Sequence, residues 1–144
     1  MGKKRIVKKK GSTMSKGLKA RALAKTSKRK MAEGVLNIQS TYNNTKVNLS
    51  DNDGNVVTWS SSGALGFSGA KKSTPFAAAK VGEVVGEKAK MMGVKEVRAV
   101  IKGVGQGRES ALRAFVAVGI NLTSIKDETP VPHNGPRPPK ARRV

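Results

Sequence analysis

Positive charge gathers at the two ends of this chain, and that distribution limits where a folded core can form. Residues 1–32 contain thirteen Lys and Arg without an acid, and residues 132–144 contain four without an acid. The residues between them hold twelve basic side chains against all nine acids of the chain. Blocks of like charge repel each other and stay extended until a polyanion neutralises them. We therefore expect one globular body at residues 34–129, a basic N-terminal arm at 1–33 and a Pro- and Arg-rich C-terminal arm at 130–144.

Composition narrows the classes of partner. The formal net charge is +20, which favours nucleic acid as the ligand. No apolar run approaches the roughly 18 residues that a membrane span needs, so no membrane partner is predicted. The chain has no Cys, and His133 is its single His, so disulfides and a zinc site are excluded. We expect no metal and no cofactor.

Three strands are predicted in the first half of the body. Apolar residues alternate with polar ones at 34–42 and 45–51, and β-branched residues are frequent there. Asp53-Gly54 is a hairpin signal, and residues 56–62 follow it as a third strand. These strands should form an antiparallel meander, with Trp59 in the core. The Gly- and Ser-rich segment 61–75 reads as a loop too polar to contribute to the core.

The second half alternates helices with strands. Thr74 and Pro75 are a typical helix start, and Gly93 should end that helix. Its apolar face comprises Phe76, Ala77, Val81, Val84, Val85, Ala89 and Met92. A strand at 94–103, a helix at 110–119 and a strand at 120–129 complete the order βββαβαβ. This order predicts an α/β fold with a mixed sheet and helices packed on it. It resembles the three-layer, ribonuclease-H-like arrangement of some translational proteins.

Two loops could hold phosphate. Gly103, Gly105 and Gly107 lie between a strand and a helix, where backbone amides and a helix N-terminus are available. Their spacing fits neither the dinucleotide fingerprint nor the P-loop, so two readings stay open. The loop is either a tight connection that needs positive φ or an RNA-backbone contact assisted by Arg108.

The second candidate loop precedes the first predicted helix. It combines two cations, Lys71 and Lys72, with the hydroxyls of Ser73 and Thr74 at a helix start. That combination suits a backbone phosphate. A capped helix with solvated lysines is the alternative reading.

Catalysis has no convincing set of residues. A two-metal nuclease needs several converging carboxylates. Asp51 and Asp53 flank a turn, where Asp is expected for conformational reasons. The remaining candidates, Glu83, Glu87 and Glu96, fit exposed positions on a helix and a strand.

Five aromatic residues offer few platforms for stacked bases, and Phe76 and Phe115 are expected in the core. Recognition should therefore rely on phosphates and RNA shape.

Several segments together resemble one family. "STYNNTKV", "KKSTPFAAAK", "GVGQGRESALRA", "IKDETPVPHNG" and "RPPKARRV" occur in this order from about residue 34 to the C-terminus. The series is similar to the universal eleventh protein of the small ribosomal subunit, in its bacterial or organellar form. Archaeal and eukaryotic relatives end differently.

The resemblance implies a ribonuclease-H-like body without catalytic activity, bound to small-subunit ribosomal RNA on the platform of a cytoplasmic rather than an organellar ribosome. Messenger RNA at the exit region and platform proteins six, eighteen and twenty-one are the implied neighbours. Carried over by motif, the implied RNA contacts are Asn43, Asn44, Lys71, Lys72, Ser73, Thr74, Gly105, Gly107, Arg108, His133, Asn134, Arg137, Lys140, Arg142 and Arg143.

The chain departs from the family pattern at three places. Val104 and Gln106 stand where relatives usually carry Pro, and Pro136 stands where they often carry Cys. The N-terminal arm is longer than usual, and residues 15–30 could form a helical turn or two.

Asn134 precedes Gly135, which offers little steric protection against succinimide formation, and some family members carry isoaspartate here. Asn134 is therefore a candidate modification site, with a plain tight turn as the alternative.

Two rival functions make different predictions. A DNA-compacting protein with basic tails would bind duplex DNA without preference, whereas the family reading requires selectivity for one RNA fold. A nuclease would show metal-dependent hydrolysis that Asp51→Asn abolishes.

Overall fold

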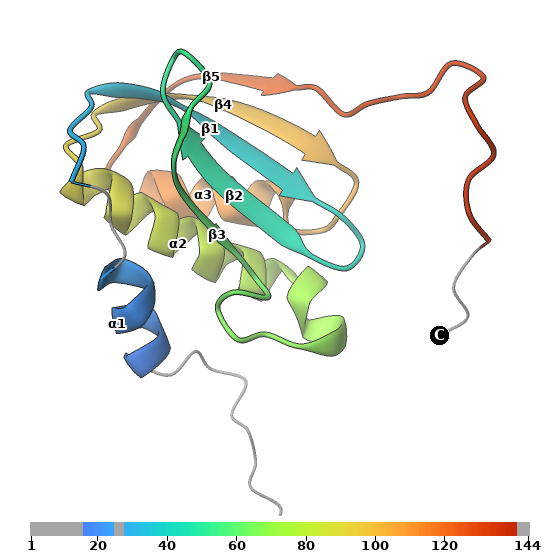
Figure 1. The fold of residues 1–144 in the computed structure, drawn as a ribbon, viewed down its shortest axis with the longest axis horizontal. Coiled ribbons are helices and arrows are strands. Elements are labelled where there is room, and N and C mark those ends of the chain that lie inside the picture. Colours follow the sequence, from blue (N-terminus) through green and yellow to red (C-terminus); the bar gives the residue numbers. More distant parts are fainter. Residues whose placement is uncertain (1–15, 25–27, 141–144) are drawn as a thin grey trace, which may run out of the picture.

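A five-stranded mixed sheet with helices on one face forms the body of the protein (Figure 1). The structure, a computed structural model, describes residues 16–24 and 28–140. The elements are α1 (Lys16–Ala24), β1 (Glu33–Ser40), β2 (Thr45–Ser50), β3 (Val56–Ser61), a 3-10 helix η1 (Gly69–Ser73), α2 (Pro75–Met91), β4 (Glu96–Gly103), α3 (Arg108–Ala117) and β5 (Asn121–Asp127). The predicted order βββαβαβ is confirmed, with α1 preceding it. Among the described helices none is long and apolar enough to cross a membrane.

The strand order in the sheet is β3-β2-β1-β4-β5. β2 pairs antiparallel with both β1 and β3, which confirms the predicted meander. β4 pairs parallel with β1 and with β5, as the helical connections require. β1 is therefore the central strand, and its inward residues Leu36 and Ile38 are almost fully buried.

The ends of α2 follow from local sequence. The Thr74 hydroxyl oxygen accepts a hydrogen bond from the Ala77 N–H at 3.3 Å, and Pro75 occupies the first turn. The chain leaves the helix through Gly93, whose φ of 81° is the left-handed conformation that favours glycine. Both ends were predicted correctly.

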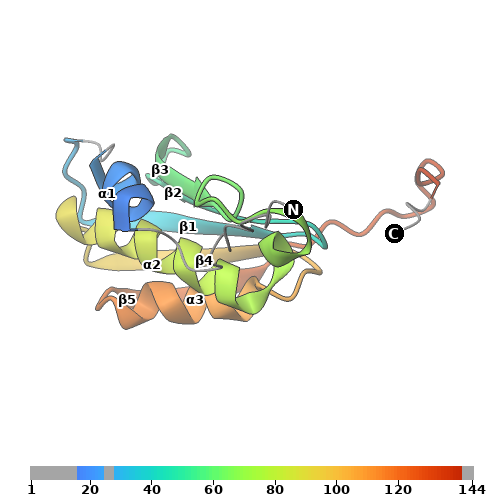
Figure 2. The ribbon, with the colours of Figure 1, turned by 90° about the horizontal axis from the view of Figure 1, so that it is seen from below.

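α2 and α3 lie side by side on the same face of the sheet, as Figure 2 shows. A Cβ on Gly82 would come within 2.2 Å of the Ala111 carbonyl oxygen, and a Cβ on Gly86 within 2.8 Å of Val118. These glycines allow the two helix backbones to approach closely, and neither helix crosses to the other face. The body therefore has two layers, and the three-layer expectation was wrong.

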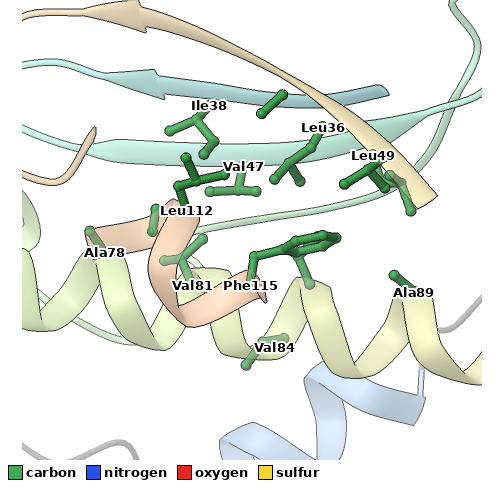
Figure 3. Packing of buried hydrophobic residues seen from close by; sticks show 14 of the residues in the cluster. Leu36, Ile38, Val47, Leu49, Ala78, Val81, Val84, Ala89, Leu112 and Phe115 are labelled. Carbon is green, nitrogen blue, oxygen red and sulfur yellow. The ribbon is translucent and has the colours of Figure 1, made fainter. Parts of the chain in front are cut away.

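The core fills the space between this face and the two helices (Figure 3). Leu36, Val47 and Leu49 point from the sheet toward Val81 and Phe115, and all five are fully buried. Burying a side chain of this size contributes about 1.5–3 kcal/mol. The expectation that Phe115 packs in the core is confirmed.

Two aromatic side chains lie elsewhere than predicted. Trp59 is 59% exposed, because it points outward from the edge strand β3 while Thr58 and Ser60 point inward. Phe76 is 51% exposed. It falls one position outside the buried row of α2, in the helical row that continues with Lys80 and Glu83.

The loop after β3 also contributes to the core, contrary to prediction. Leu65 is 2% exposed and Phe67 is 8% exposed, and both belong to the main apolar cluster. Backbone hydrogen bonds from Leu65 N–H to the Ser61 carbonyl and from Phe67 N–H to the Ser62 carbonyl fold the segment onto the sheet. Two apolar residues among Gly and Ser were enough to bury it.

Helix α1 docks on α2. The Lys19 ammonium lies 3.1 Å from a Glu83 carboxylate oxygen and 2.8 Å from one of Glu87. Hydrogen bonds to Glu87 and then Glu83 raise the pKa of Lys19, although burial acts the other way. Glu83 and Glu87 are thus half-buried rather than exposed as expected. Part of the segment assigned to the N-terminal arm folds onto the body.

Candidate nucleic-acid interface

Three loops meet at the end of the sheet where β1, β3 and β4 finish. The last residues of β1 and β4, Ser40 and Gly103, are partners in the parallel ladder. The Gly105 N–H donates to the Ser40 carbonyl at 3.0 Å, which brings the glycine loop against the β1–β2 turn. We refer to residues 41–44, 69–74 and 104–108 together as the loop end of the body.

The glycine loop is a close-packed connection. A Cβ on Gly105 would lie 2.4 Å from the Thr41 carbonyl oxygen. A Cβ on Gly107 would lie 2.5 Å from Thr45 Oγ1 and 2.6 Å from the Ala78 Cβ. Among the three glycines of this loop, only Gly103 has a positive φ, 101°, so the tight-connection reading holds there, and close approach explains the other two glycines. The exposed residues of the loop are Val104 and Gln106.

The N-termini of α2 and α3 point to the loop end (Figure 1). Lys71 and Lys72 lie in η1, directly before the cap of α2, and Thr74 donates its hydroxyl proton to the Lys71 carbonyl at 2.7 Å. Ser73 likewise donates to the Ala70 carbonyl at 3.2 Å. Unpaired amides at a helix start attract anions, and flanking cations add to that attraction. The two lysines therefore stand where a phosphate would be favoured.

The two asparagines of the β1–β2 turn have different surroundings. The Thr41 hydroxyl oxygen accepts from the N–H groups of Asn43 and Asn44 at 3.4 Å and 3.1 Å. The side-chain oxygen of Asn44 accepts from the Thr45 N–H at 3.0 Å, so that oxygen helps to form the turn. Asn43 is exposed, and its side chain can reach a ligand.

The Arg108 side chain forms an ion pair with Asp127. Its guanidinium donates to Asp127 Oδ2 at the end of β5. The pKa of Asp127 falls to about 2, chiefly because the Thr129 hydroxyl and backbone N–H donate to it and then because of Arg108. A phosphate that contacts Arg108 must share or displace this carboxylate.

The same cluster fastens the start of the C-terminal tail to the loop end. The Thr129 hydroxyl donates to Asp127 Oδ1 at 2.6 Å, and the Gly103 N–H donates to the Thr129 oxygen at 3.2 Å. Beyond it, every residue from 130 to 140 is exposed and the tail runs away from the body (Figure 1).

The tail carries the other implied contacts. His133, Arg137 and Lys140 are exposed along it. Asn134 adopts a left-handed conformation with a φ of 54° before Gly135. Arg142 and Arg143 lie outside the described residues.

Sequence reasoning missed two exposed aromatic side chains, Tyr42 in the loop end and Phe76 in the first turn of α2 beside it. Tyr42 is 77% exposed at the tip of the β1–β2 turn. Phe76 is held by an edge-on contact with Phe67, at 6.1 Å between ring centroids, while the Lys80 ammonium lies 5.8 Å from its ring. The helical phase of Phe76 could have placed it outside the core. Nothing local distinguishes Tyr42 from a packed turn residue.

Asp51, the residue on which a nuclease would depend, has a structural role. Its carboxylate accepts from the N–H groups of Asp53 at 3.1 Å and Asn55 at 2.9 Å, and Arg29 pairs with it at 3.0 Å. The hydrogen bond from Asn55 is the largest influence that lowers its pKa. Within residues 16–24 and 28–140, no three His, Asp or Glu side chains gather as a metal site would require.

Comparison with known protein families shows to which family this chain belongs. The family model described as ribosomal protein S11 matches residues 34–143, which is most of the chain. The match includes all five strands of the sheet except Glu33, the first residue of β1. Proteins of this family are structural components of the small ribosomal subunit that bind ribosomal RNA. The chain therefore belongs to the ribosomal protein S11 family.

Proposed function

We propose that the loop end and the C-terminal tail bind small-subunit ribosomal RNA on the platform of a cytoplasmic ribosome. The observation that supports this is convergence: implied contacts from three separate loops lie at one end of the body, and the tail is fastened to that end through Thr129. In this proposal residues 34–129 form the RNA-binding body and 130–144 the arm that RNA orders.

Each group of residues has a distinct role in the proposal. Lys71 and Lys72, with the amides at the start of α2, neutralise backbone phosphate, and Ser73 and Thr74 shape that helix start. Asn43 and the rim of the glycine loop contact the RNA backbone. The tail contributes His133, Asn134, Arg137, Lys140, Arg142 and Arg143. Its prolines reduce the entropy lost when the tail becomes ordered, and its arginines hold phosphates.

The proposed neighbourhood follows the family. It includes the messenger exit region, with messenger RNA nearby, and platform proteins six, eighteen and twenty-one. The protein acts there without catalysis, through shape and charge.

Sucrose-gradient sedimentation of a cell lysate at moderately high salt tests the proposal. The full chain should comigrate with the small subunit and with intact ribosomes. Truncation after Thr129 keeps the hydrogen bonds of Thr129 to Gly103 and Asp127, so the body should stay folded and yet lose this comigration. A truncated chain that remained on the subunit would refute the tail as anchor. A full chain found with nucleoid DNA or free at the top would refute the ribosomal assignment.

Asn134 is also proposed as an isoaspartate site. The left-handed turn before Gly135 is exposed and leaves the side-chain carbonyl accessible. Mass spectrometry of the tail peptide should show a one-dalton increase, and its absence would leave the turn as the whole explanation.

A further inference from the structure

A groove of about 590 Å³ lies between α1 and the edge strand β3. It is separate from the loop end, because α1 docks beside the second half of α2 through Glu83 and Glu87. One wall comes from α1, which precedes the family match at residues 34–143, and the other comes from β3 inside that match. The volume falls in the range of ligand-sized pockets.

Trp59 is the main side chain of the β3 wall. It is the single Trp of the chain, and it is 59% exposed. Buried Leu65 and half-buried Ala22 line the same groove. An exposed indole in a groove that apolar residues also line offers a flat surface on which a planar group can stack.

The charged residues that line this groove have one sign. They are Arg21, which is exposed on α1, and Lys88, which is buried, whereas no carboxylate from the described residues lines it. The groove beside α3 and β5 differs, since Glu109 and Asp127 line it together with arginines. The α1–β3 groove therefore suits a ligand that combines a flat apolar part with negative charge.

We propose that this groove receives one unstacked nucleotide of RNA, with its base on the Trp59 indole and its phosphate at Arg21. The inference rests on the proposed function and adds to it a second contact, away from the loop end. Stacking of a base on an aromatic side chain strengthens binding by about 5- to 150-fold. α1 thus completes a site that the body alone does not form.

Trp59 makes the test direct because it is the only Trp in the chain. Full-length protein is titrated with a labelled single-stranded oligoadenylate, and Trp59 emission is recorded together with the anisotropy of the label. Emission should fall as the RNA binds, because a stacked base quenches indole fluorescence. Inorganic polyphosphate of equal charge should bind without this quenching.

Matched variants separate the groove from general charge. Arg21→Gln should weaken the quenching titration several-fold, whereas Arg113→Gln removes an exposed cation of α3 outside this groove and should change it little. Trp59→Leu should weaken binding in the anisotropy assay by at least about fivefold, and Trp59→Phe less, because Phe keeps a face for stacking. Trp59 is more than half exposed, so these variants keep the core intact.

The outcomes distinguish this inference from the proposed function. Trp59 emission that stays unchanged at saturating RNA would overturn the groove as a nucleotide site and leave the loop end and the tail as the RNA contacts. Equal quenching by polyphosphate would overturn the base contact. Ribosome comigration in the gradient assay stands or falls independently of both results.

Discussion

Gly107 occupies a position where the molecule has no room for a side chain. Its φ of −81° suits any residue, so conformational freedom is not the reason for glycine here. The reason is the approach of Thr45 from β2 and Ala78 from α2. The sequence located this loop and its three glycines, but the contacts that require two of them come from residues about 30 and 60 positions away. Such a requirement cannot be read from local sequence.

Gly107→Ala should lower the free energy of unfolding by about 1–3 kcal/mol, because the new methyl group would overlap the Thr45 hydroxyl and the Ala78 methyl group. The loss outweighs the roughly 0.4–1 kcal/mol that Ala gains by restricting the unfolded chain. Gly63→Ala is the matched control, since its Cβ would meet only Lys72 Cδ at an ordinary 3.7 Å. Urea unfolding of both variants measures the difference, and equal midpoints would contradict the packing argument.

Asp127 should make stability depend on pH in acid. Its pKa is about 2 in the folded protein against an ordinary 3.8, so folding favours the ionised form. The stabilisation is fully present above about pH 4 and is lost as the pH falls toward about 2. Asp127→Asn should reduce the fall of the unfolding temperature across this window.

The comparison needs a control for net charge. Asp53→Asn removes an exposed carboxylate from the β2–β3 turn and so matches the change in net charge. Residual pH dependence should persist in Asp127→Asn, because the pKa values of Asp51, Glu83 and Glu128 are also lowered. Parallel curves for all three proteins would show that the Thr129 and Arg108 contacts do not stabilise the fold.

The helices differ in how far their own residues determine where they begin and end and whether they are stable. α2 carries its cap, its apolar row and its terminal glycine in sequence, so its bounds could be predicted. α1 has no apolar stripe, and nine residues of helix are marginal in isolation. Its order depends on α2, where Glu83 and Glu87 receive Lys19. Those glutamates looked like an ordinary solvated face because their partner is more than 60 residues away.

Lys19→Ala should release α1 from the body. The expected result is faster amide hydrogen exchange across residues 16–24, with a global loss of at most about 1 kcal/mol because the ion pairs are partly exposed. Arg113→Ala removes a pair of similar length, 3.3 Å to Glu109, within α3, where both partners are about 80% exposed. It should leave α1 unchanged. Exchange by mass spectrometry decides between them, and a slow α1 in Lys19→Ala would mean that apolar packing of Ala22 is sufficient.

At the scale of the molecule, topology determines where the implied contacts gather. β1, β4 and β5 are parallel, so the turn after β1, the glycine loop and the start of the tail leave the sheet at the same end. The strand pattern was therefore enough to bring these segments together. It could not show that Asp127 already holds Arg108, because that contact joins side chains from two separate elements. It also could not show that Tyr42 is exposed, because nothing local distinguishes it from a packed turn residue.

The salt dependence of RNA binding should show which end of the body the RNA contacts. Arg137→Gln with Lys140→Gln removes two tail cations, and Lys90→Gln with Lys95→Gln removes two exposed cations from the opposite end, where α2 finishes and β4 begins. Both double variants lose the same net charge, so long-range attraction changes equally. Each cation that neutralises a phosphate contributes about 0.7–0.9 to the slope of log affinity against log salt. The tail variant should therefore lose about 1.4–1.8 from that slope in titrations with ribosomal RNA, and the opposite-end variant should keep the original value. Equal losses would place RNA at both ends of the sheet and contradict a footprint centred on the loop end and the tail.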